Sequence, residues 1–195
     1  MSYTALQIDG LKELINIGGG HAATSLSKLL QQPIDMRVPE VEILAYKDLY
    51  QQIMAEDKEV HVVISQIEGA FRGIFLFVLT DESAAKLRQL MIQESDPSEE
   101  LKQSVINELT NILTNSFLIA IGQLLETQLS ASLPSASYDF FGAAISSIYL
   151  AMAQYDEQVM VIRNEFVYAK ETLEASLFLI PEIGVLENIF DSLGI

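Results

Sequence analysis

The chain has 195 residues, half of them apolar, and this length allows one domain with a substantial core. Its 27 acidic and 11 basic side chains give a formal net charge of −16, an excess that repels phosphate backbones and argues against nucleic-acid binding. Cysteine is absent, which excludes disulfides and thiolate chemistry, and the longest apolar run, residues 73–80, is too short to span a membrane.

The first predicted element is a helix over about residues 5–30. Thr4 can cap it and Gln7 completes a capping box, after which apolar residues recur at helical spacing. The run of three glycines at 18–20 opposes this helix, because each costs about 0.5–1 kcal/mol relative to alanine. We expect the glycines to permit close approach of a second helix, whose bulkier Leu113 and Phe117 fill the space.

An extended passage, two strands and a short helix are predicted next. The extended passage contains Pro39. Residues 59–69 and 72–80 are rich in Val, Ile and Phe, which indicates a pair of strands. Thr80 is then predicted to cap a short helix that ends at Met91.

The second half begins with a polar linker, residues 92–100, and a long helix over about residues 97–127. Asp96 is the predicted N-cap, with Pro97 as the first helical residue. An extended passage around Pro134 follows. The remaining predictions are three strands and a terminal helix, at residues 144–154, 158–169, 174–180 and 181–194.

The two halves therefore share one order of elements, which indicates an internal duplication. A shift of 95 residues aligns the long helices without a gap, so that Glu13 matches Glu108 and Asn16 matches Asn111. The glycines do not repeat.

From this repeat we expect a single α+β domain made of two repeats, about residues 1–92 and 96–195. The two long helices should lie side by side on one face of a sheet built from both halves, with pseudo-two-fold symmetry.

A set of polar side chains shares one face of each long helix, because steps of four and three residues keep them within about 60° around the axis. The set is Asp9, Glu13 and Asn16 in the first helix and Ser104, Glu108 and Asn111 in the second. One Glu–Asn pair at this spacing is common on a solvated helix face. Two pairs at the same repeat position, each followed after twenty-two residues by Pro39 or Pro134, indicate a function.

This doubled motif resembles the CheC/CheX/FliY family of chemotaxis phosphatases. The phrases "NIGGGHAATSLSKLL" and "NELTNIL" are similar to the family's own phrases at its two sites. Two intact motifs fit the CheC type, since the CheX type carries one per chain. The resemblance implies a CheC-like fold and hydrolysis of the aspartyl phosphate on the response regulator CheY. It also implies no cofactor in this chain, because the regulator supplies its own magnesium ion.

The resemblance implies four catalytic residues, which are Glu13, Asn16, Glu108 and Asn111. A carboxamide both accepts from and donates to water, so the asparagines suit positioning of the attacking water. A carboxylate aimed at the phosphoryl group would repel it, so the glutamates suit docking against a lysine of the regulator. Asp9 and Ser104 are expected to support the motif, and the two prolines to fix the chain path.

Other classes remain open. The chain could be a binding module that sequesters phosphorylated regulator, or an adaptor for the receptor deamidase CheD, a partner that the resemblance implies.

A metal enzyme is disfavoured, because the two histidines, His21 and His61, lie far apart in the sequence and cysteine is absent. His21 is expected to pack or to cap. No serine has a nucleophile-elbow context, which disfavours a Ser–His–Asp hydrolase. No signal-peptide pattern opens the sequence, and we expect a cytoplasmic protein.

Overall fold

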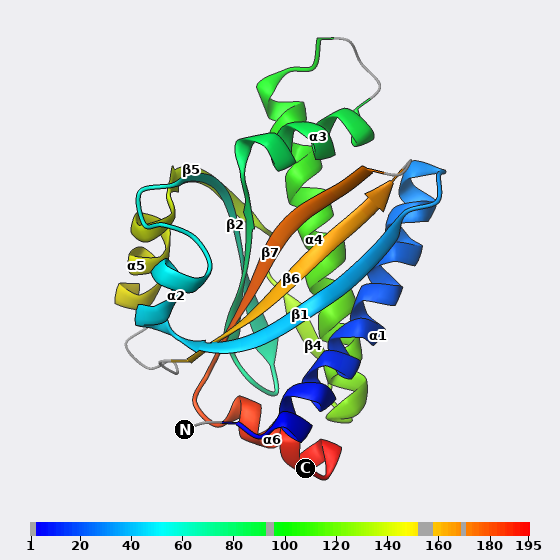
Figure 1. The fold of residues 1–195 in the computed structure, drawn as a ribbon. Coiled ribbons are helices and arrows are strands. Elements are labelled where there is room, and N and C mark those ends of the chain that lie inside the picture. The colour runs from blue at the N-terminus through cyan, green and yellow to red at the C-terminus, as the bar shows by residue number, and fades with distance from the viewer. Residues whose placement is uncertain (1–2, 93–95, 152–157, 169–170) are drawn as a thin grey trace.

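The computed structural model describes residues 3–92, 96–151, 158–168 and 171–195, and shows one antiparallel sheet with helices on both faces (Figure 1). The helices are α1 (Ala5–Leu30), α2 (Leu49–Gln52), α3 (Asp81–Met91), α4 (Glu99–Leu124), α5 (Phe141–Ala151) and α6 (Val185–Leu193), with a 3₁₀ turn at Tyr46–Asp48. The strands are β1 (Asp35–Ala45), β2 (Glu59–Gly69), β3 (Gly73–Leu79), β4 (Leu129–Ala131), β5 (Ser135–Phe140), β6 (Gln158–Tyr168) and β7 (Glu171–Pro181). The predicted α+β class is confirmed.

The sheet is built from both halves of the chain. Its order is β1-β6-β7-β3-β2-β4, and β5 also pairs with β2. The central pair joins β3 of the first half to β7 of the second, from Gly73 opposite Pro181 to Val78 opposite Ser176. Pro39 lies in the edge strand β1, where the register to β6 shifts. An edge strand with a bulge tolerates proline, which has no N–H to donate to the ladder.

Two hydrophobic cores lie on opposite faces of this sheet. Alternate residues of β3 point into opposite cores. Phe75 and Phe77 belong to the first core, under α1 and α4, whereas Leu76 and Val78 belong to the second core, under α2 and α5. β3 is therefore buried along its whole length. Among the described residues, only α4 is long and apolar enough to cross a membrane by length and composition, and most of its apolar stretch is buried inside the protein.

The two long helices run side by side in opposite directions (Figure 1). They come close at Gly18, where an added Cβ would lie 2.5 Å from Cδ1 of Phe117 and 3.0 Å from its Cα. The prediction that a glycine lets this helix approach Phe117 is thus confirmed at position 18. Gly20 is different: it is exposed, and an added Cβ would meet nothing within 4 Å.

The first long helix begins as predicted. The backbone N–H of Gln7 donates to Oγ1 of Thr4 at 3.2 Å, and the N–H of Thr4 donates to Oε1 of Gln7 at 3.0 Å, which completes the capping box. The predicted cap of α3 is also present, with the N–H of Ser83 donating to Oγ1 of Thr80 at 3.3 Å.

The start of α4 was predicted wrongly. Its N-cap is Ser98, whose backbone is extended and whose Oγ accepts from the N–H of Leu101 at 3.2 Å. A serine with this geometry satisfies an orphan N–H of the first turn, so Asp96 and Pro97 lie before the helix. The helix ends at Leu124, three residues before the predicted end.

The predicted strand at residues 144–154 is also wrong, since residues up to Ala151 belong to helix α5 and residues 152–154 lie outside the described part of the chain. The buried residues of α5 are Phe141, Ala144, Ile145 and Ile148, which follow the i, i+3, i+4, i+7 spacing of a helix face. That face packs on the second core. The short helical segment at residues 46–52 was not predicted.

Candidate functional site

The first predicted motif lies on the outer face of α1. Asp9, Glu13 and Asn16 are all exposed. Leu14 and Ile15, on the opposite side of the same turns, are buried in the first core. The apolar face thus anchors the helix, while the polar face is available to a partner.

The second motif occupies the corresponding face of α4. Ser104 and Glu108 are exposed, whereas Asn111 is half-buried. Leu109 and Leu113 hold this part of the helix in the first core.

Asn111 has a side-chain partner that sequence reasoning missed. Nδ2 of Asn115 donates to Oδ1 of Asn111 at 2.8 Å and to the backbone oxygen of Asn111, also at 2.8 Å. The two residues stand four apart on one helix, a spacing at which side chains meet. That spacing was the signal available in the sequence.

The structure keeps the two motifs apart. Asn16 precedes Gly18 by two residues and Asn111 precedes Phe117 by six, and the two helices run in opposite directions. With a rise of 1.5 Å per residue, the asparagines are separated by about 12 Å along the helix axes. The arrangement therefore presents two separate Glu–Asn faces.

One of the two prolines lies in a strand and the other in a connection between strands. Pro39 is inside β1, and Pro134 lies half-buried between β4 and β5. Each belongs to the strand passage that follows its long helix.

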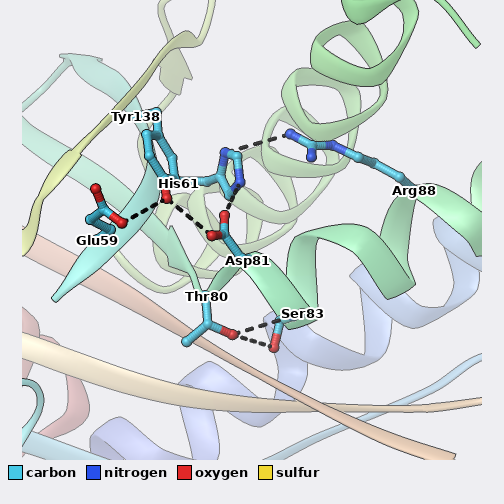
Figure 2. Close-up of polar contacts among 7 residues, drawn as sticks. All are labelled: Glu59, His61, Thr80, Asp81, Ser83, Arg88 and Tyr138. Carbon is cyan, nitrogen blue, oxygen red and sulfur yellow. Dashed lines mark hydrogen bonds and ion pairs between the residues drawn. The ribbon is translucent and has the colours of Figure 1, made fainter.

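A second polar cluster joins β2, β5 and α3 (Figure 2). Nε2 of His61 lies 2.9 Å from Oδ1 of Asp81, and Nδ1 of His61 lies 3.5 Å from Nη2 of Arg88. The hydroxyl of Tyr138 donates to Oδ2 of Asp81 at 3.0 Å and to Oε2 of Glu59 at 3.4 Å.

This cluster suits a structural role better than catalysis. Burial, followed by the positive charge of Arg88, lowers the pKa of His61, so the ring is neutral near pH 7. Arg88 can only donate, so the neutral ring accepts at Nδ1 and donates from Nε2 to Asp81. Both ring nitrogens are occupied, which leaves neither free as a general base. The hydrogen bond to Asp81 raises the pKa of Tyr138 to about 12, so the phenol stays a donor.

The remaining candidates for chemistry are few in the part of the chain that the structure describes. There, no group of three or more His, Asp or Glu side chains is arranged to hold a metal ion. His21 is exposed within α1, so it neither packs in the core nor caps a helix end.

Comparison with known proteins supports the family resemblance. Residues 6–43 match the model of the CheC-like family. The chain is 31% identical to the CheY-P phosphatase CheC of Bacillus subtilis, over 96% of this chain and 94% of that protein. It is 28% identical to the flagellar motor switch phosphatase FliY of the same species, over 66% of this chain and 35% of that protein.

The fold has a counterpart among solved structures. FliY of Thermotoga maritima superposes with a TM-score of 0.75 at 20% identity, over 100% of this chain and 98% of that one. Since a relative of more than 30% identity aligns along nearly the whole chain, this protein belongs to the CheC-like family.

Proposed function

We infer that this protein hydrolyses the aspartyl phosphate of the chemotaxis response regulator CheY. The observation that carries the proposal is the pair of Glu–Asn faces on the exposed sides of α1 and α4. The relative named a CheY-P phosphatase, which aligns over 96% of the chain, supports the choice of substrate.

The asparagines suit the chemistry of this reaction. Transfer of a phosphoryl group to water needs an in-line nucleophile and neutralised charge, and little covalent help. An acyl phosphate already has a good leaving group. The side-chain oxygen of Asn16 or Asn111 can accept a hydrogen bond from the attacking water and so orient a lone pair of that water towards phosphorus. The magnesium ion that neutralises the phosphoryl oxygens belongs, in this proposal, to the regulator.

The other motif residues are assigned to recognition. Glu13 and Glu108 are exposed carboxylates that can pair with a lysine of the regulator. Asp9 and Ser104, one turn earlier on the same faces, support that contact.

Two observations support the further proposal that both halves are copies related by pseudo-two-fold symmetry. With β5 taken as the neighbour of β2 and β4 left out, the order is β1-β6-β7-β3-β2-β5, and exchanging β1, β2 and β3 with β5, β6 and β7 gives the same order in reverse. Grooves also lie at the C-terminal end of each long helix, and the first is lined by residues 23, 24, 27, 28 and 31–34. The same positions shifted by 95, which are residues 118, 119, 122, 123 and 126–129, line the second. Such a duplication would give two active sites per chain.

Asparagine variants test the proposed function. Asn16→Ala and Asn111→Ala should each remove one site's share of turnover, and the double variant should lower kcat about a hundredfold, because an oriented water acts mainly in the transition state. Binding of a stable phosphoryl analogue of the regulator should change little. Decay of phosphorylated CheY is followed with the protein at one hundredth of the regulator concentration.

Two results would overturn the proposal. Acceleration that needs stoichiometric amounts of this protein would indicate a sequestering module. Wild-type turnover by the double variant would remove the asparagines from the mechanism. Binding to the deamidase CheD stays a prediction, to be checked by titration of the purified proteins.

A further inference from the structure

The two proposed sites differ in how their asparagine is held. In α4, the side-chain amide of Asn115 donates to Oδ1 of Asn111 at 2.8 Å, and both residues are half-buried. The same Nδ2 group donates to the backbone oxygen of Asn111 at 2.8 Å, so its two hydrogens are both used. Asn115 is thereby fixed to the helix backbone at one contact and to the asparagine side chain at the other.

This contact determines how the amide of Asn111 is oriented. The terminal torsion of an asparagine is broad and roughly two-fold, so a free side chain presents its oxygen or its nitrogen almost equally. The bond from Asn115 defines which end is the oxygen. One lone pair of Oδ1 then remains for a water, and the Nδ2 group of Asn111 remains as a donor to a phosphoryl oxygen.

The first site has no such contact. The position that corresponds to Asn115 under the 95-residue shift is Gly20, four residues after Asn16. Glycine has no side-chain donor, and the space around it is open, since an added Cβ would meet nothing within 4 Å. Asn16 itself is exposed.

We propose that Asn115 is a positioning residue for Asn111, and that it makes the site on α4 faster per turnover than the site on α1. The inference rests on the proposed phosphatase function. A side chain that is held in the productive orientation before the regulator docks loses no further rotational freedom when the transition state forms. The contact from Asn115 should therefore raise kcat.

The first test removes the contact where it exists. In an Asn16→Ala background only the site on α4 works, and there Asn115→Ala should lower kcat about fivefold, the value of one neutral hydrogen bond, with KM for phosphorylated CheY unchanged. Asn188→Ala, an exposed change on α6, should leave both constants unchanged.

The second test builds the contact where it is absent. In an Asn111→Ala background only the site on α1 works, and Gly20→Asn should raise its kcat several-fold. The matched control is Gly20→Ala, which also improves the helix by about 0.5–1 kcal/mol but adds no amide. Open space at this position allows both side chains.

The outcomes separate the inference from the function on which it rests. Unchanged kcat in Asn115→Ala, a rise in KM alone, or an equal gain from Gly20→Ala and Gly20→Asn would each overturn the positioning role. Full turnover by the Asn16→Ala/Asn111→Ala double variant would overturn the proposed function itself.

Discussion

At the scale of single residues, the glutamate and the asparagine of each motif are expected to affect different kinetic constants. In an Asn111→Ala background, Glu13→Gln should raise KM about three- to tenfold with a smaller change in kcat, because an exposed charged contact contributes about 1 kcal/mol to docking. Steady-state turnover of phosphorylated CheY measures both constants. Asp191→Asn on α6 makes the same change of net charge and should leave KM unchanged, and an equal effect there would refute the docking role.

A second residue-scale prediction concerns His61, which titrates in contact with Asp81 and Arg88. Its pKa is lowered by burial and then by Arg88, so folding favours the neutral ring. The unfolded chain binds a proton more readily at this histidine, so stability is lost as the pH falls below the ordinary histidine pKa of about 6.5. The free energy of urea unfolding should therefore fall more between pH 7.5 and 5.5 in the wild type than in His61→Gln.

The control for this prediction is His21→Gln, which changes an exposed histidine of α1. It should retain the wild-type pH dependence. If His61→Gln also retained the wild-type pH dependence, the cluster of Figure 2 would not be the source of that dependence.

At the scale of elements, the packing of α1 against α4 explains why one glycine of the run is needed. Gly18→Ala would force a Cβ to within 3.0 Å of the Cα of Phe117, which a rotamer change cannot relieve, so we expect a loss of about 2 kcal/mol. Gly20→Ala, two residues on, should instead stabilise by about 0.5–1 kcal/mol. Denaturant unfolding of both variants gives the comparison, and equal effects would contradict the close approach at position 18.

The elements that could be predicted are those whose signals are local. Thr4 with Gln7, and Thr80 before its helix, are caps readable from a few residues, and both are present. The hairpin of β2 and β3 follows from two apolar runs close together in the chain.

The failures arose where two local signals competed. At residues 144–154, Ile and Tyr favoured a strand, but the spacing of Phe141, Ala144 and Ile145 matches a helix face packed on the second core. Before α4, the prediction placed the N-cap at Asp96 and Pro97 in the first turn, whereas the side chain that caps the helix is that of Ser98. The motif positions stay a prediction from the sequence repeat, whereas the bond from Asn115 to Asn111 depends on rotamers that sequence spacing leaves open.

At the scale of the whole molecule, the sheet joins the halves through contacts distant in the chain. β1 of the first half pairs with β6, and β3 pairs with β7, so neither half could complete its sheet alone. Local patterns do not specify such pairings, although the repeat predicted a sheet shared by both halves. The shared sheet sets the relative position of α1 and α4, and hence of the two motifs.

The charge of the whole molecule leads to the last prediction. With a net charge of −16 and exposed glutamates in both motifs, docking of a lysine-bearing regulator should weaken as salt rises, because exposed charges are screened over about 8 Å at physiological ionic strength. The dissociation constant of a stable phosphoryl analogue of CheY, measured from about 50 to 500 mM salt, tests this. The Glu13→Gln/Glu108→Gln variant should bind more weakly at low salt and show a shallower dependence. If the salt dependence of the dissociation constant were the same in this variant as in the wild type, charge elsewhere on the surface would guide the regulator. If the wild-type dissociation constant did not change with salt, electrostatic docking would be excluded altogether.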